Sequence, residues 1–113
     1  MKEIPVVYIE IPSKNYDASK AFYLKVFGWD LADFGPTYSS TLTMGINVGL
    51  QGDTQEATQA PLTVLEVTDL EAALRAVVDG GGTVTRPIFS FPGGRRFQFR
   101  DPSGNELAVM QAE

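Results

Sequence analysis

The sequence predicts an α+β fold: two tandem βαβββ modules whose sheets form an open, curved, barrel-like cup with the helices outside. Three observations lead to this prediction. Two β-branched runs, at residues 6–11 and 62–67, are each followed by apolar residues at helical spacing. Strand-like segments separated by turn residues follow each predicted helix. The halves also match in detail, since residues 9–11 resemble residues 65–67, which is typical of a duplicated unit.

The first half begins with a strand at residues 6–11. A helix is expected next, with Asn15 or Asp17 as its N-cap and Gly28 at its end. Residues at i, i+3, i+4 and i+8 predict the face that packs on the sheet: Ala18, Ala21, Phe22 and Val26. Three strands should follow, at residues 29–34, 38–44 and 46–51, with turns at Gly35-Pro36 and at Gly45.

The second half repeats this plan after a polar linker. We expect one domain, residues 1–113, made of a module at 1–51, the linker at 52–60 and a module at 61–113. Asp69 can cap the second helix, and three glycines at 80–82 should stop it. Its predicted packing face consists of Leu70, Ala73, Leu74 and Val77. Strands are predicted at residues 83–89, 95–100 and 106–111, with a hairpin turn at 101–105.

Composition narrows the class of partner. The formal charge of −5 and the pI near 4.6 argue against nucleic acid and against an anionic membrane surface. No stretch approaches the ~20 apolar residues that span a bilayer, and the N-terminus lacks the apolar region of a signal peptide, so a cytoplasmic location is expected. The absence of cysteine excludes disulfides, thiolate metal sites and cysteine nucleophiles.

Two motifs carry a resemblance to a known family. They are Phe22-Tyr23-x-x-Val26-Phe27-Gly28-Trp29 and Gly94-Arg95-Arg96-Phe97-Gln98-Phe99-Arg100-Asp101-Pro102-Ser103-Gly104-Asn105-Glu106-Leu107. Over nearly its whole length the chain resembles the glyoxalase/bleomycin-resistance/dioxygenase family, also called the vicinal oxygen chelate superfamily. The resemblance implies the cup-shaped fold and a homodimer. It leaves the activity open, because members include lyases, isomerases, dioxygenases and antibiotic-binding proteins.

The resemblance also locates the positions of a metal site. Glu106 matches the eighth-strand ligand of metal-binding members. The first-strand position falls at Tyr8 or Val6, the fourth-strand position near Val48 or Leu50, and the fifth at Leu62. A catalytic divalent metal wants at least three N or O ligands plus an open position. We therefore expect no cofactor, and any bound metal would be a hard, oxygen-bound Mg²⁺ or Mn²⁺.

Strand alternation assigns side chains to the concave face of the cup. The candidate ligand-binding residues there are Tyr8, Glu10, Glu66, Arg96, Gln98 and Met110, and the candidate catalytic residue is Glu106. Alternate residues of the same strands, such as Ile9, Phe97 and Val109, should instead pack against the helices. Carboxylates, a guanidinium, a phenol and an amide among apolar neighbours suit a small polar or anionic ligand.

Each candidate residue has two interpretations. Glu106 could act as a general base, or it could pair with Arg96 or Arg100. Arg96 could hold a substrate carboxylate or phosphate, or form an ion pair with Glu106 or Glu10. Tyr8 could donate a proton or line the wall.

Glu10 and Glu66 form a pseudo-symmetric pair that could lie at the rim, solvated or paired with arginine. The sequence favours a metal-free binding protein for a small polar or aromatic molecule. A glyoxalase-like lyase or isomerase that uses Glu106 is the alternative. Extradiol dioxygenase action is disfavoured because it needs iron held by two His and a carboxylate, and the chain has no His.

Overall fold

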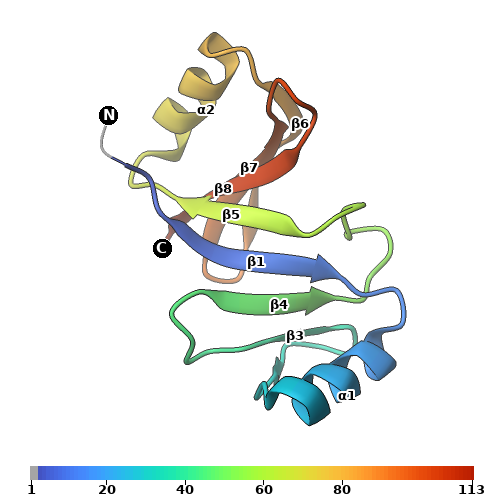
Figure 1. Ribbon diagram of the computed structural model, residues 1–113. Coiled ribbons are helices and arrows are strands. Elements are labelled where there is room, and N and C mark those ends of the chain that lie inside the picture. Colours follow the sequence, from blue (N-terminus) through green and yellow to red (C-terminus); the bar gives the residue numbers. More distant parts are fainter. Residues whose placement is uncertain (1–2) are drawn as a thin grey trace. The chain divides into compact units, whose positions relative to one another are not determined.

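The computed structural model describes residues 3–113, and its elements follow the order βαβββ-βαβββ (Figure 1). Two compact units make up the chain, one of residues 8–62 and the other of residues 3–7 and 63–113. Each unit holds an open four-stranded part of the sheet and one helix. The predicted α+β class and the two βαβββ modules are therefore confirmed. In residues 3–113, no helix is long and apolar enough to cross a membrane.

The strands of the first module lie in the order β2-β3-β4-β1. Their bounds are β1 Val6–Pro12, β2 Ala32–Asp33, β3 Tyr38–Ser40 and β4 Asn47–Gln51. β1 runs parallel to β4, while β3 is antiparallel to both β4 and β2.

Two strands of this module are shorter than the sequence predicts. The segment at 29–34 contributes only two strand residues, because Trp29 stacks on Tyr23 of the preceding helix at 4.6 Å between ring centroids. The segment at 38–44 leaves the strand after Ser40. There the Asn47 side chain accepts hydrogen bonds from the Met44 backbone N–H and the Thr41 hydroxyl, which closes a loop.

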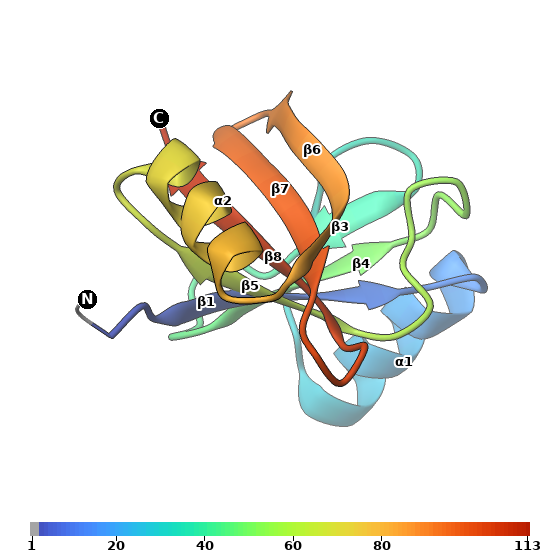
Figure 2. The same cartoon turned by 90° about the horizontal axis from the view of Figure 1, so that it is seen from above.

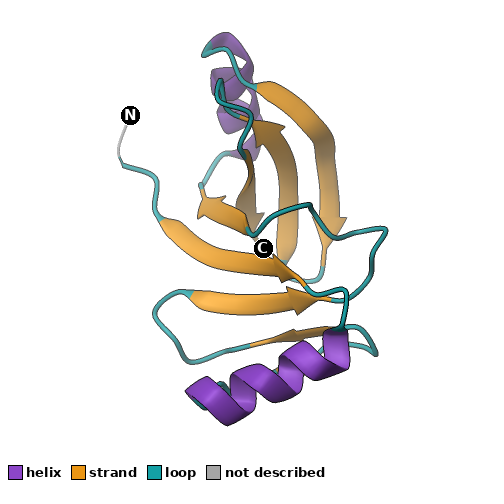
Figure 3. Ribbon diagram, turned by 45° about the vertical axis from the view of Figure 1, so that its right-hand side comes forward, coloured by secondary structure: helices purple, strands orange, loops and turns teal. Residues whose placement is uncertain are grey.

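The first helix, α1, spans Tyr16–Phe27 and ends as predicted at Gly28, whose φ of 68° lies in the left-handed region that glycine adopts most easily (Figure 3). Asn15 occupies the N-cap position, as one of the two predicted alternatives, but its side chain makes no capping hydrogen bond. The predicted packing face is wrong: Ala18, Ala21, Phe22 and Val26 are all exposed. The half-buried side is the opposite one, where Lys20 pairs with Asp33 of β2 and Tyr23 stacks on Trp29.

The second module has the strand order β5-β8-β7-β6, with β5 parallel to β8 and the other pairs antiparallel. The bounds are β5 Leu62–Glu66, α2 Leu70–Asp79, β6 Thr83–Phe91, β7 Gly94–Arg100 and β8 Glu106–Ala112. Figure 2 shows α2 lying against β7 and β8, in agreement with its contacts to β6, β7 and β8. Leu70 and Ala73 of α2 join Phe97 and Val109 in a buried core. The predicted packing face of this helix is therefore confirmed.

Two hydrogen bonds fix the start of α2. Asp69 accepts from the Ala72 N–H at 3.0 Å, which confirms the predicted cap. The side-chain carbonyl of Gln111, from β8, accepts from the Leu70 N–H at 2.9 Å. The second bond ties the first turn of the helix to the strand that carries Glu106.

The predicted turn at 101–105 joins β7 to β8. One oxygen of Asp101 accepts from the backbone N–H groups of Ser103 and Asn105, each at 2.9 Å. These bonds to Asn105 and Ser103 hold the pKa of the Asp101 carboxyl below its usual range. Gly104 has a φ of 88°, a conformation that other residues adopt only with strain. The turn sets the register in which Glu106 opens β8 opposite Arg100.

Candidate functional site

The second module brings five of the predicted site residues to one face of its sheet. The register places Arg96 opposite Met110 and Gln98 opposite Ala108, next to the row in which Glu106 faces Arg100. Glu66 of β5 lies beside Met110 on the other side. Because side chains two residues apart share a face, the shared-face residues are Glu66, Arg96, Gln98, Glu106 and Met110. The predicted facing of these residues within the module is confirmed.

A continuous chain of polar contacts runs across this face. The Thr85 hydroxyl donates to Oε2 of Glu106 at 2.6 Å, and the Gln98 amide donates to the same oxygen at 3.1 Å. At its other end, the Gln98 carbonyl accepts from the Arg96 guanidinium at 3.3 Å. We call these four residues the Glu106 chain. The sequence left open a direct Glu106–Arg96 pair, whereas the structure places the buried Gln98 amide between the two charges.

Aromatic rings orient the guanidinium at the end of this chain. The Arg96 Cζ lies 5.2 Å from the centre of the Phe89 ring and 5.8 Å from that of Phe91. Stacking of a guanidinium on aromatic rings restricts its rotamers and retains its charge. The neighbouring Arg95 does something different: it points to α2 and forms a two-bond contact with Glu71, at 2.7 and 3.2 Å. Of these two arginines, therefore, Arg96 shares the face of Glu106.

Thr85 is the member of the Glu106 chain that the sequence did not indicate. It lies on β6, where the pairing with β7 is irregular between Val84 and Arg86. Thr83, two residues earlier, pairs with Arg100, so alternation along the strand puts Thr85 on the same face as Glu106. A single exposed Thr carries no motif, so its contact with Glu106 becomes visible only when the pairing of the strands is known.

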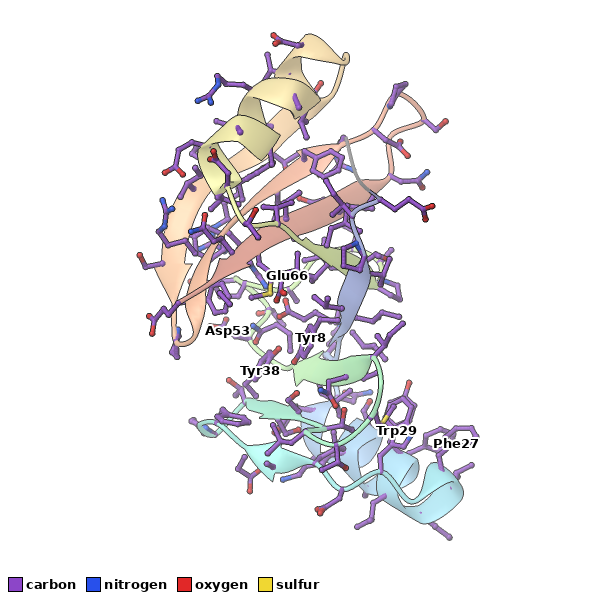
Figure 4. The ribbon with its side chains drawn as sticks, turned by 90° about the vertical axis from the view of Figure 1, so that its left-hand side faces the viewer. Tyr8, Phe27, Trp29, Tyr38, Asp53 and Glu66 are labelled. Carbon is purple, nitrogen blue, oxygen red and sulfur yellow. The ribbon has the colours of Figure 1, made fainter. Side chains whose placement is uncertain are left out.

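The first module holds a second polar cluster, made of Tyr8, Glu10, Tyr38 and Ser40. The Tyr38 hydroxyl donates to Oε2 of Glu10 at 3.0 Å and lies 2.6 Å from the Tyr8 hydroxyl. Tyr8 also donates to the Ser40 hydroxyl at 3.0 Å. Figure 4 labels Tyr8 and Tyr38 at the centre of this tyrosine cluster. The structure thus joins the predicted Tyr8 and Glu10 through Tyr38, and Ser40 contacts Tyr8; the sequence analysis singled out neither Tyr38 nor Ser40.

A glycine makes room for the tyrosine cluster. Gly49 lies between Ser40 and Glu10 in the register of the sheet, and a Cβ there would overlap the hydroxyl oxygens of both tyrosines. Only a residue without a side chain lets the two phenols meet over β4. The need for glycine at position 49 cannot be recognised before the strand pairing is known, because Gly49 is near Ser40 in space and not in sequence.

Burial governs the chemistry of the cluster. Glu10 is only 5% exposed, so of the two expected alternatives, solvated or paired with arginine, the solvated one is wrong. Burial, and next the negative charge of Glu10, raise the pKa of the Tyr38 phenol far above its ordinary value. Tyr38 therefore keeps its proton and remains a hydrogen-bond donor to the carboxylate. The cluster can hold a buried acidic group in place and can offer phenol oxygens at the face of the sheet.

The groups next to Glu106 do not match the ligand set of a divalent metal. Such a metal needs several lone-pair donors directed at one point. The nearest partners of the Glu106 carboxylate are instead a hydroxyl and an amide N–H that donate to it, with a guanidinium one residue farther along. Donors and a positive charge beside a carboxylate favour a polar or anionic molecule over a cation.

The comparison with protein families agrees with the resemblance found in the sequence. Residues 6–109 match the family model described as Glyoxalase/Bleomycin resistance protein/Dioxygenase superfamily. Because the match covers most of the chain, the protein belongs to this superfamily. The two motifs, at residues 22–29 and 94–107, lie entirely inside the matched region.

Relatives and solved structures extend this assignment. The chain is 28% identical to "Putative glyoxylase CFP32" of Mycobacterium bovis over 93% of its length, and it spans 44% of that longer protein. A superfamily member from Vibrio splendidus 12B01 has a TM-score of 0.73 at 18% identity, covering 98% of this chain and 100% of that one. Methylmalonyl-CoA epimerase from Mycobacterium tuberculosis has a TM-score of 0.75 at 13% identity, with 96% and 87% covered. At these identities the two structures show the common fold alone.

Proposed function

We propose that the protein binds a small anionic molecule on the β5-β8-β7-β6 face, without a metal. The observation that carries this proposal is the Glu106 chain, in which the buried Gln98 amide bridges Arg96 and Glu106. A buried amide that satisfies both of its ends holds its neighbours in fixed positions. The face therefore offers an anion-binding group and a carboxylate at a set separation.

The side chains of the Glu106 chain suggest a class of ligand. The Arg96 guanidinium suits a carboxylate or phosphate, since its planar N–H groups match those oxygens in pairs. Both donors to Glu106 end on Oε2, so Oε1 is the oxygen that faces a ligand hydroxyl or amine. Met110 lies opposite Arg96 and supplies apolar surface beside it. A small carboxylate or phosphate that also carries a hydroxyl group or an aromatic ring fits this combination.

A second candidate function uses the same residues for catalysis. In a glyoxalase-like lyase or isomerase, Glu106 would take a proton from carbon or oxygen of the bound molecule. The favouring observation is the fixed carboxylate: Thr85 and Gln98 hold Oε2 and leave Oε1 as the basic atom. General-base catalysis needs a group held within hydrogen-bond reach of the proton it removes.

A thermal-shift screen of small carboxylates, phosphates, aromatics and electrophiles tests the binding proposal, because a ligand of the native state raises its melting temperature. Compounds that combine an anionic group with a hydroxyl or a ring should produce the largest shifts. Calorimetry on the best compound should then compare Arg96→Gln with Arg95→Gln. We expect about a tenfold or larger loss of affinity for the first variant, the scale of a hydrogen-bonded charge.

Arg95→Gln is the matched control. It removes the same charge from the residue next to Arg96, where the guanidinium pairs with Glu71. Its affinity should stay within about twofold of the wild type, since an exposed ion pair contributes little. Equal losses in the two variants would show a general charge effect and would refute the anchoring role of Arg96. If Glu106→Gln leaves affinity and any detected turnover intact, Glu106 has no part in either function.

A further inference from the structure

A second guanidinium, that of Arg86, lies beside the aromatic ring that orients Arg96. The Arg86 Cζ is 3.6 Å from the centre of the Phe89 ring, and the Arg96 Cζ is 5.2 Å from the same point. Arg86 and Phe89 both belong to β6, whereas Arg96 belongs to β7. Because both Cζ atoms lie within 5.2 Å of one point, a single small molecule beside the ring can reach both guanidiniums.

Irregular pairing of β6 explains why Arg86 shares the face of the Glu106 chain. The register places Arg86 opposite Gln98, and the pairing is irregular on both sides of Arg86. In a regular strand, sequence neighbours such as Thr85 and Arg86 would point to opposite faces. Thr85 contacts Glu106, however, and Arg86 is paired with Gln98, so both lie on one face. A bulge that re-aims a side chain in this way is common beside functional sites.

The local sequence and the position of β6 both favour this irregularity. β6 is the last strand in the order β5-β8-β7-β6, and Figure 2 shows it beside β7. Pro87 directly follows Arg86. Proline has no N–H to donate, so within a sheet it is found on edge strands and at bulges. The segment that carries Arg86 is therefore irregular for a reason that its own sequence supplies.

Two guanidiniums beside one ring define the charge of the ligand that they suit. A guanidinium stays charged at every pH at which proteins are folded, and its planar N–H groups bind the oxygens of a carboxylate or phosphate in pairs. The attraction of each guanidinium to the ring of Phe89 uses no hydrogen bond. Together the two side chains can hold two carboxylates of one molecule, or one phosphate group from two sides.

We propose that the ligand of this face is a dianion, either a phosphate ester or a dicarboxylate, held by Arg86 and Arg96 together beside Phe89. This inference rests on the proposed function, because it names the charge of the molecule that the face of the Glu106 chain binds. A ligand with one negative charge is held by Arg96 alone. A dianion gains a second set of charge-assisted hydrogen bonds from Arg86.

Three probes that share a benzene ring test the preference by calorimetric titration of the full chain. Benzoate has one carboxylate, isophthalate has two, and phenyl phosphate is a dianion at about pH 8, well above its second pKa of about 6. Isophthalate or phenyl phosphate should bind about tenfold or more tightly than benzoate, and the tighter of the two identifies the anionic group. Equal affinities for all three would overturn this inference and leave the proposed function standing. Failure of all three to bind would contradict both.

Arg86→Gln isolates the contribution of the second guanidinium. In this variant the affinity for the tighter dianion should fall by about tenfold, whereas the affinity for benzoate, which Arg96 holds, should stay within about twofold. Retained benzoate binding also shows that the variant is folded. Arg95→Gln, where the guanidinium pairs with Glu71, should keep the preference for the dianion. A preference that survives Arg86→Gln, or one that both variants lose equally, would overturn the inference.

Discussion

The two modules share one order of elements and have different interiors. The second buries apolar side chains around α2, with Phe97 fully buried at the centre. The first also buries Val48 and Leu50, but most of its buried residues are polar: Glu10, Ser13, Ser39, Ser40 and Thr41. Most of the large apolar residues that the chain exposes also belong to the first module, between residues 22 and 46. The two modules thus share a topology, while the second has a mainly apolar interior and the first a mixed one that is richer in polar side chains.

This difference indicates separate tasks for the two halves. A packed apolar core supports the second module from within and leaves its polar face, with the Glu106 chain, available for a ligand. The first module joins its polar side chains in the tyrosine cluster, and the apolar side chains of α1 stay exposed. The variants below probe this division, in order of expected effect on stability.

The largest loss should come from the core of the second module. Phe97→Ala should lower the free energy of unfolding by about 3–5 kcal/mol, because it removes buried apolar surface and leaves a cavity. Phe34→Ala, in a loop of the first module where the ring is 58% exposed, should change it by less than about 0.5 kcal/mol. Urea unfolding measures both. Similar losses in the two variants would remove the contrast between the modules.

The tyrosine cluster should be sensitive to one added methyl group. Gly49→Ala places a Cβ against the hydroxyls of Tyr8 and Tyr38 and should cost about 1–3 kcal/mol, the range for overpacking. At Gly45 a Cβ would meet open space, so Gly45→Ala should be close to neutral. A Gly49→Ala protein as stable as the wild type would show that the cluster rearranges without cost.

Two tyrosines of the first module offer a sharper contrast. Tyr38→Phe removes the donor to the buried Glu10 and should destabilise the protein by about 1–3 kcal/mol. Among residues 3–113, the buried hydroxyl of Tyr16 has no hydrogen-bond partner, so Tyr16→Phe should be neutral or stabilising. The reverse order of stabilities in a denaturant titration would contradict the assigned roles.

Alkaline pH should reveal the state of Tyr38. Burial and Glu10 raise the pKa of this phenol in the folded protein, so the folded state holds the proton more tightly than the unfolded chain does. The resulting stability is fully present below the unfolded pKa of about 10 and is lost as the pH rises above it. Tyr38→Phe should lose less stability over that interval. Parallel pH profiles of the two proteins would contradict the raised pKa.

The smallest effect separates the starts of the two helices. Asp69→Ala removes a capping bond to Ala72 and should cost about 1 kcal/mol. Asn15→Ala should cost less, because the Asn15 side chain makes no such bond. Thermal unfolding of the two variants measures the difference, and equal costs would show that the cap at Asp69 does little in the folded protein.

The sequence predicted the second module better than the first, for a physical reason. In α2 the apolar face predicted from the sequence is the face that packs in the core, and the predicted cap, Asp69, makes its hydrogen bond. Local sequence pattern and tertiary packing therefore favour the same structure. In α1 the pattern is equally clear, but the contacts lie on the other side of the helix, where Lys20 pairs with Asp33 of β2 and Tyr23 stacks on Trp29. Periodicity identifies a face that packs, and it does not say which surface that face will meet.

The candidate site shows the same limit. Alternation placed Arg96, Gln98 and Glu106 on one face, as the register confirms. It did not show that Gln98 separates the two charges, because that depends on side-chain lengths across paired strands. Tyr38 and Ser40 join Tyr8 only through the long-range pairing of β3 with β4 and of β4 with β1. The contact of Thr85 with Glu106 likewise depends on the pairing of β6 with β7 and of β7 with β8.

The central claim is that the face of the Glu106 chain binds an anionic molecule through Arg96 and needs no metal. Calorimetric titration of the best ligand into chelator-treated wild type and into chelator-treated Arg96→Gln tests it most directly. We predict unchanged affinity for the chelator-treated wild type and about a tenfold or larger loss for the variant. Binding that disappears on chelation and returns with Mg²⁺ or Mn²⁺, or a variant that binds as tightly as the wild type, would contradict the claim.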